Sequence, residues 1–234
     1  QLNAGILNVG ANDLEIHDNI SIQSGAMLTT TAASTLKIMT DNNLNSGLVF
    51  TSGSSIDQLM VEYGGSGSVE LESSLAIAGE IQIHEGTVSI ESGSTLTMNA
   101  GSLVQIMNGK LQSNGGTFTG TASYDVEYMG DSTVMTGVEV TGSGLNDVTV
   151  DIADGDVVLN DDVTVAGELE LINGRLDLNA NDLILNGTLT TNNQSTPFVG
   201  DENSDLHLNI TTLANDTIYF EDDQNLQQLI VTVT

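Results

Sequence analysis

The sequence VELESSLAIAGEIQIHEGTVSI, residues 69–90, carries the clearest structural signal in the chain. Apolar residues within it form pairs separated by a single residue, and a new pair starts every six or seven residues. This alternation at period two indicates strands with one face buried. Strands this short, joined by polar corners, are typical of a chain that winds around a narrow core, with about 20 residues in a three-strand turn.

The same pattern returns elsewhere at a fixed spacing. VVLNDDVTVAGELELINGRLDL, residues 157–178, aligns with residues 69–90 without gaps at an offset of 88, and every apolar position matches. GILNVGANDLEI, residues 5–16, aligns with GRLDLNANDLIL, residues 174–185, at an offset of 169. Matches at an offset of 170 link two further sets of positions: Ser34, Leu36, Ile38, Leu59 and Val61 correspond to Ser204, Leu206, Leu208, Leu229 and Val231.

These repeats predict the architecture. We expect an all-β protein, a right-handed parallel β-helix (β-solenoid) built of internal repeats of about 85 residues. The copies cover approximately residues 5–85, 86–173 and 174–234, the last one incomplete, within a single continuous solenoid over residues 1–234. Because the third copy stops within the pattern, we expect either a window on a longer array or an open end that stacks on another subunit.

The corners between the predicted strands carry glycine and Asn-Asp pairs. Asn12-Asp13 and Asn181-Asp182 precede strands, where Asn and Asp side chains bond to nearby backbone groups. Five glycines are predicted to adopt positive φ where the chain turns: Gly79, Gly86, Gly167, Gly174 and Gly187.

Composition limits the possible partners. The chain has 234 residues with 3 Lys and Arg against 32 Asp and Glu, a formal net charge of −29. Such a surface repels phosphate backbones and anionic lipids, so the sequence predicts no nucleic-acid partner. No run approaches the roughly 18 apolar residues of a membrane span, so no membrane insertion is expected. The 39% hydrophobic content argues against a disordered acidic tail, and the lack of cysteine excludes disulfides.

Few residues point to catalysis. Enzymes on this architecture that cleave acidic sugars place Lys or Arg beside clustered acids, whereas here Lys37, Lys110 and Arg175 are scattered. Paired carboxylates for neutral glycoside hydrolysis stay open, because pairing depends on distance. The histidines His17 and His84, like His207, have no partner at metal-binding spacing and are expected at the surface.

One acidic segment is a candidate metal site. Asp151, Asp154 and Asp156 place three carboxylates within six residues around a glycine, and Ca²⁺ accepts oxygen ligands in irregular geometry. Asp161-Asp162 and the acidic residues 221–223 are weaker candidates. Solvated acidic corners are the alternative interpretation of all three segments. No other cofactor is predicted.

The segment GRLDLNANDLILNGTLT, residues 174–190, resembles the GxLDLNGNxLTLxG repeats of very large secreted surface proteins of Bacteroidetes. Residues 218–220 (IYF) and 225–231 (NLQQLIV) are similar to the next block of that repeat. The resemblance implies export across the outer membrane, in many members by the type IX pathway, and a role in gliding or attachment. It also implies O-glycosylation at Asp-Ser/Thr motifs, which residues 131–133 and 216–218 match.

These observations together predict a function. We expect a non-enzymatic, extracellular or cell-surface stalk segment of a repetitive bacterial adhesin or filament. Its expected partners are adjacent repeats of the same or neighbouring chains, and surface polysaccharide or glycans. The alternative is a carbohydrate-binding or carbohydrate-active β-helix of the polysaccharide lyase or hydrolase kind.

Overall fold

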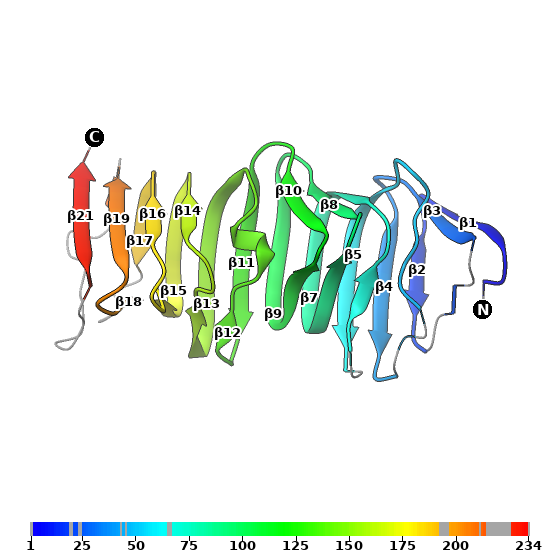
Figure 1. Cartoon of the computed structure of the whole chain (residues 1–234), viewed down its shortest axis with the longest axis horizontal. Coiled ribbons are helices and arrows are strands. Elements are labelled where there is room, and N and C mark those ends of the chain that lie inside the picture. Colours follow the sequence, from blue (N-terminus) through cyan, green and yellow to red (C-terminus); the bar gives the residue numbers. More distant parts are fainter. Residues whose placement is uncertain are drawn as a thin grey trace. The chain divides into compact units, whose positions relative to one another are not determined.

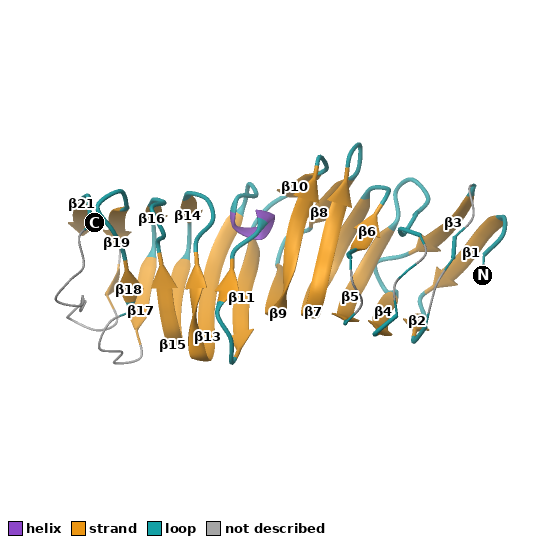
Figure 2. Cartoon of the chain, turned by 60° about the horizontal axis from the view of Figure 1, so that its bottom comes forward, coloured by secondary structure: helices purple, strands orange, loops and turns teal. Residues whose placement is uncertain are grey.

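The computed structural model describes residues 2–18, 21–22, 25–42, 44, 46–64, 67–191, 197–210, 212–213 and 226–233. The chain divides into two compact units, residues 1–124 and 125–234, which are described separately. Figure 1 colours the strands from blue at the N-terminus to red at the C-terminus, and Figure 2 shows that strands make up nearly all of the regular structure.

Unit 1 is a stack of parallel strands. The strands are β1 (Gly5–Gly10), β2 (Asp13–Ile16), β3 (Ala26–Thr30), β4 (Thr35–Thr40), β5 (Ser55–Tyr63), β6 (Val69–Leu71), β7 (Leu75–Glu91), β8 (Thr95–Met98), β9 (Ser102–Asn114) and β10 (Thr117–Gly120). Each pairs in parallel with a strand about one coil earlier or later, and β2, β4, β5, β7 and β9 follow one another in one sheet.

The coil of unit 1 has the predicted size. Val69 of β6 pairs with Val88 near the C-terminal end of β7, so one turn of the coil between these positions takes 19 residues. Between those points β7 also pairs with β8 through Leu75 and with β9 through Ile81, which accounts for three strand segments in one turn. The prediction of a coil of about 20 residues is confirmed, whereas the expected short strands at Leu75, Ile81 and Val88 run together in the single 17-residue strand β7.

Unit 2 repeats this arrangement. Its elements are β11 (Tyr124–Gly130, whose first residue belongs to unit 1), β12 (Val134–Met135), the 3₁₀ turn η1 (Val138–Val140), β13 (Leu145–Val158), β14 (Val163–Val165), β15 (Glu168–Asp177), β16 (Leu183–Leu185), β17 (Thr188–Thr191), β18 (Phe198–Val199), β19 (Asp205–Ile210), β20 (Thr212–Leu213) and β21 (Gln228–Val233). The pairings are parallel, and β14, β16, β19 and β21 form one sheet. No helix of the described segments is long and apolar enough to cross a membrane.

The structure confirms the fold class and the repeat at the level of strand register. Val69 pairs with Val88 in unit 1, and their counterparts Val157 and Leu176 pair in unit 2. Leu75 and its counterpart Val163 both point into the core, with exposures of 2% and 3%. A second register is shared as well: the stack Leu14, Leu36, Leu59 corresponds to the stack Leu183, Leu206, Leu229. The hand of the coil and its continuity over the whole chain stay predictions.

A buried serine closes several of the corners. In each case the serine N–H donates to the carbonyl oxygen three residues earlier, which defines a β-turn. All five side chains are buried, and the hydroxyls of Ser34, Ser54, Ser102 and Ser204 are hydrogen bonded; that of Ser102, for example, donates to the Asn99 carbonyl oxygen at 2.7 Å. The sequence alignment used two of these serines only as matching positions. The residues concerned are Ser34, Ser54, Ser94, Ser102 and Ser204.

The corner predictions are partly confirmed. Asn12 and Asn181, equivalent in the repeat, both donate from Nδ2 to the carbonyl oxygen three residues earlier, at 2.7 and 3.1 Å. Gly86 and Gly174 have φ of +85° and +77°, as predicted.

For the other three glycines the prediction of positive φ is wrong. A Cβ on Gly79 would lie 2.7 Å from the Asp57 carbonyl oxygen, in the neighbouring coil. Gly167 and Gly187 are crowded in the same way by residues about one coil earlier. Glycine is needed there because successive coils approach closely, and backbone conformation plays no part.

Candidate functional site

A groove of about 340 Å³ in unit 1 gathers polar side chains where β4 and β5 end. Met39 and Glu62 are paired neighbours on these strands, and the chain leaves the sheet directly after them. Asn42 is held in place because its Nδ2 donates to Asp18 Oδ1 at 3.0 Å and its N–H donates to Thr40 Oγ1 at 3.1 Å. The lining residues are His17, Met39, Thr40, Asp41, Asn42 and Glu62.

The rim of this groove carries a cluster of charged groups. Glu15 Oε2 lies 3.1 Å from His17 Nε2, and Glu15 Oε1 lies 3.2 Å from Lys37 Nζ. The hydrogen bond from His17, followed by the hydrogen bond and charge of Lys37, lowers the pKa of Glu15 below its ordinary value. The groove itself presents carboxylate, amide and hydroxyl groups, which suit a ligand rich in hydroxyl groups. Sequence analysis singled out only His17, because the other residues meet through strand register.

Elsewhere several carboxylates bind donors on a neighbouring coil. In unit 1 Asn114 Nδ2 donates to Glu91 Oε2 at 2.7 Å, and Gln58 Nε2 donates to Glu80 Oε1. In unit 2 Asn173 Nδ2 donates to Asp151 Oδ1 at 2.6 Å. These pairs are 22 to 23 residues apart, which is one turn of the solenoid. The acidic side chains therefore fasten one coil to the next.

Backbone amides of unit 2 serve the same purpose. The N–H of Asp147 donates to Asp125 Oδ1 at 3.1 Å, and the N–H of Glu168 donates to Asp147 Oδ1 at 2.6 Å. Thr190 Oγ1 continues the series with a 2.6 Å hydrogen bond to Glu168 Oε1. Each of these carboxylates thus accepts a hydrogen bond from the following coil.

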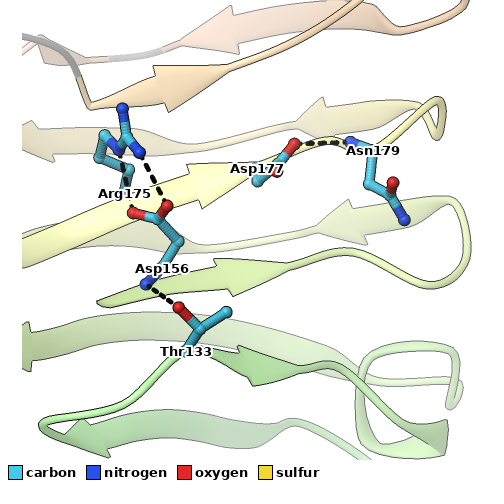
Figure 3. Close-up of polar contacts among 5 residues, drawn as sticks. All are labelled: Thr133, Asp156, Arg175, Asp177 and Asn179. Atoms are coloured by element: carbon cyan, nitrogen blue, oxygen red, sulfur yellow. Dashed lines mark hydrogen bonds and ion pairs between the residues drawn. The ribbon is translucent and has the colours of Figure 1, made fainter. Parts of the chain in front are cut away.

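Arg175 makes the most regular ion pair of unit 2. Its Nε and Nη2 each lie 2.9 Å from an oxygen of Asp156, so the contact is bidentate (Figure 3). Asp156 is placed one coil away by the pairing of β13 with β15, and its N–H donates to Thr133 Oγ1 at 3.3 Å. Figure 3 also shows Asp177, which accepts from the N–H of Asn179 at the corner that follows.

Two of the three predicted calcium ligands have other partners in this structure. Asp151 binds Asn173, Asp156 binds Arg175, and Asp154 is exposed. The segments that the structure describes contain no group of three His, Cys, Asp or Glu residues that could hold a metal ion. Residues 221–223 lie outside those segments. The geometry therefore gives the calcium prediction no support.

Unit 2 also holds a buried acid that sequence analysis missed. Glu139 is 1% exposed, and its Oε1 accepts hydrogen bonds from Tyr128 Oη and the Gly137 N–H, both at 2.7 Å. Because Glu139 lies between two valines, the sequence pattern predicts an outward-facing residue of a strand, whereas the chain forms a 3₁₀ turn there. The contacts tie η1 to β11 and indicate a structural role.

A scan of family models, a search of curated proteins and a search of solved structures each gave no match to this chain. The resemblance to Bacteroidetes surface repeats thus stays a hypothesis based on the sequence. Of the two glycosylation motifs, Ser132 and Thr133 lie exposed in the turn before β12. The motif at residues 216–218 is outside the described segments.

Proposed function

We propose that this chain is a non-enzymatic structural segment, a stalk or spacer of a repetitive bacterial surface protein. One observation carries the proposal: the repeat copies keep the inward residues and exchange the outward ones. Ile81 and Leu169, at equivalent positions, are both fully buried. Directly after the next inward residues, Ile83 and Leu171, the half-buried His84 of one copy is replaced by the half-buried Ile172 of the other.

The polar contacts support the same function. A spacer must resist bending, and stiffness grows when each coil is fastened to the next through its core and its surface. Here hydrogen bonds between coils use Asp, Glu, Asn and Thr side chains on both units, as in Asn114 to Glu91 and Thr190 to Glu168. Acids engaged in this way are used for structure rather than for proton transfer.

The proposal includes location and partners. High negative charge keeps an exposed repeat soluble and prevents non-specific association, which suits a cell-surface or extracellular segment. The resemblance of residues 174–190 to secreted Bacteroidetes repeats supports the same location. Adjacent repeats are the partners that a solenoid requires, and surface polysaccharide is the ligand class expected for an adhesin.

Paired substitutions on strand β15 test the proposal. Leu169 is fully buried and Glu170 points outward. Leu169→Ala should cost about 2–5 kcal/mol of stability, and Leu169→Asp should unfold its unit and abolish attachment of cells that display the chain. Glu170→Ala, like His84→Ala and Asp154→Ala, should leave melting temperature and attachment unchanged. An outward substitution that abolishes attachment, or turnover of a polysaccharide, at unchanged stability would show that a specific site does the work.

The groove of unit 1 favours carbohydrate binding as a second candidate. Its hydroxyl, amide and carboxylate groups match the hydrogen-bonding needs of a sugar chain. Glu62→Gln should then weaken binding to a polysaccharide panel. Glu85→Gln removes the same charge from the paired position on β7, outside the groove lining, and serves as the control. Equal binding by both variants and the unmodified chain would exclude the groove.

A further inference from the structure

Exposed apolar side chains gather on the end strands. In the described part of the chain six large apolar residues are exposed, and all but Met135 belong to β1 or β21. β21 pairs there only with β19, and β1 only with β3. The exposures are 63% for Ile6, 41% for Leu7, 50% for Met135, 48% for Leu229, 50% for Val231 and 75% for Val233.

The repeat shows what these positions look like when covered. Leu59, Val61 and Tyr63, the equivalents of Leu229, Val231 and Val233, are 0%, 0% and 2% exposed. At the other end, Leu7 corresponds to Leu176, which is 3% exposed. In each of these four pairs the residue type stays apolar, so Leu7, Leu229, Val231 and Val233 occupy inward positions of their strands. Ile6 differs, because its counterpart is Arg175.

Unit 1 also shows which strand covers such an edge. β5 is followed by β7, with Gln58 beside Glu80, Leu59 beside Ile81 and Val61 beside Ile83. Gln58 donates a hydrogen bond to Glu80 across this pair. β21 repeats the β5 side as Gln228, Leu229 and Val231. A strand that pairs with β21 in the same way needs four consecutive residues: an acid, an apolar residue, a residue of any type and a second apolar residue.

Strand β2 of the same chain has this sequence. β2 reads Asp13, Leu14, Glu15, Ile16, and in the described segments it pairs only with β4. Leu14 is half-buried, whereas its repeat equivalent Leu183 is fully buried between β14 and β19. The upstream edge of β2 is therefore the complement of the downstream edge of β21.

We propose that chains of this protein associate head to tail, with β21 of one copy pairing in parallel with β2 of a second copy. Gln228 then lies beside Asp13, Leu229 packs against Leu14 and Val231 packs against Ile16. The inference rests on the proposed structural function and names its partner. Because the surfaces on β21 and β2 differ, every added copy leaves one β21 edge and one β2 edge unpaired, so the assembly is open-ended.

Charge agrees with this pairing. By register with β19, Gln228, Ile230 and Thr232 stand beside the outward residues Asp205, His207 and Asn209. Asp13 and Glu15 therefore meet no carboxylate on β21, although the chain has a net charge of −29. Like charges directly opposite on paired strands would oppose association. The remaining repulsion between whole chains is screened by salt, so association should strengthen as NaCl concentration rises.

Sedimentation of purified chains tests the surface. The mean mass of the unmodified chain should rise with protein concentration at high NaCl. Val231→Asp should weaken this association more than about tenfold, because it places a charge in the contact. Met135→Asp is the matched control: Met135 is also 50% exposed but lies on β12, so this variant should associate like the unmodified chain. A chain that stays monomeric at every concentration and salt level, or a Val231→Asp variant that associates normally, would overturn the proposal.

Disulfide trapping tests the register without relying on a weakened variant. The chain has no cysteine, so single substitutions give unique thiols. Mixed Gln228→Cys and Asp13→Cys chains should form a disulfide-linked dimer on mild oxidation, because paired strand neighbours fall within disulfide reach. Gln228→Cys mixed with Glu15→Cys is two residues out of register and should link far less. Equal yields from both mixtures would contradict the proposed pairing.

The two proposals fail in different experiments. Monomeric chains with unchanged attachment would remove only the head-to-tail contact. Polysaccharide turnover by an associating chain would remove the passive spacer function and leave the contact in place.

Discussion

Substitution of two corner glycines separates backbone conformation from contact between coils. Gly86 and Gly93 have φ of +85° and +84°, so alanine meets the same left-handed strain at both positions. At Gly93 nothing lies within 4 Å of the added Cβ. At Gly86 the Cβ would overlap the carbonyl oxygen of Tyr63 and lie 3.0 Å from the Tyr63 Cβ. Tyr63 is itself 2% exposed, so it has no room to move aside.

The expected magnitudes follow from these contacts. An alanine in left-handed backbone conformation lowers the stability of the folded chain by about 1–2 kcal/mol. Alanine also reduces the conformational entropy of the unfolded chain, which offsets about 0.4–1 kcal/mol of that loss. Gly93→Ala should therefore destabilise the chain by about 1 kcal/mol. Gly86→Ala adds an overlap within a packed region, which costs about 1–3 kcal/mol more. At about 2–4 °C per kcal/mol, the melting temperatures of the two variants should differ by several degrees.

Thermal and urea unfolding of the two variants, followed by circular dichroism, measures this difference. The ranking should place the unmodified chain first, Gly93→Ala second and Gly86→Ala last. Equal stabilities for the two variants would show that the coils can separate at this corner. That result would contradict the tight stacking on which the proposed spacer function depends.

Three further predictions concern the charged surface. Burial, followed by the neighbouring carboxylates of Glu91 and Glu72, raises the pKa of Glu70 above its ordinary 4.5. The protonated Glu70 side chain therefore stabilises the folded chain in acid, and this stabilisation is lost as pH rises through the raised pKa. Glu70→Gln should thus raise the melting temperature at neutral pH and leave it unchanged in acid; a lower melting temperature at neutral pH would contradict this. Arg175→Lys should cost about 0.5–1 kcal/mol in urea unfolding, because a lysine cannot reproduce the bidentate contact with Asp156, and an unchanged midpoint would show that the pair is idle. CaCl₂ and NaCl of equal ionic strength should shift the melting temperature equally, and a larger shift with Ca²⁺ would support the predicted calcium site instead.

The sequence predicts the core of this fold well because inward positions obey a simple rule. Alternation at period two places Leu75, Ile77, Ile81 and Ile83 on one side of the strand, and all four are buried. The repeat then identifies which strands are equivalent, as Val163 shows by occupying the place of Leu75. The alternation and the repeat both depend only on the order of residues along the chain. They can therefore be recognised without knowing which strands pair with each other.

The outward contacts could not be predicted in the same way. Val69 pairs with a residue 19 positions later, whereas Ile81 pairs with one 23 positions later. This variation in coil length changes the spacing between polar side chains that meet. The groove beside Glu62 and the pairing of Arg175 with Asp156 both depend on such spacings. The short turn at Glu139 was hidden for a different reason, since alternation with valine imitates a strand.

The acidic surface makes each coil depend on the next one. Two unit charges about 5 Å apart, one coil spacing, repel by about 1 kcal/mol in water and by about 3 kcal/mol near a protein surface. The solenoid offsets this repulsion by aiming a donor at many carboxylates from the following coil, as the Asp147 and Glu168 amides do. Gln228 and Asp13 are exposed, and the proposed head-to-tail contact pairs the amide of one with the carboxylate of the other. The proposed contact thus uses the same kind of donor-to-carboxylate pairing that joins the coils within the stack.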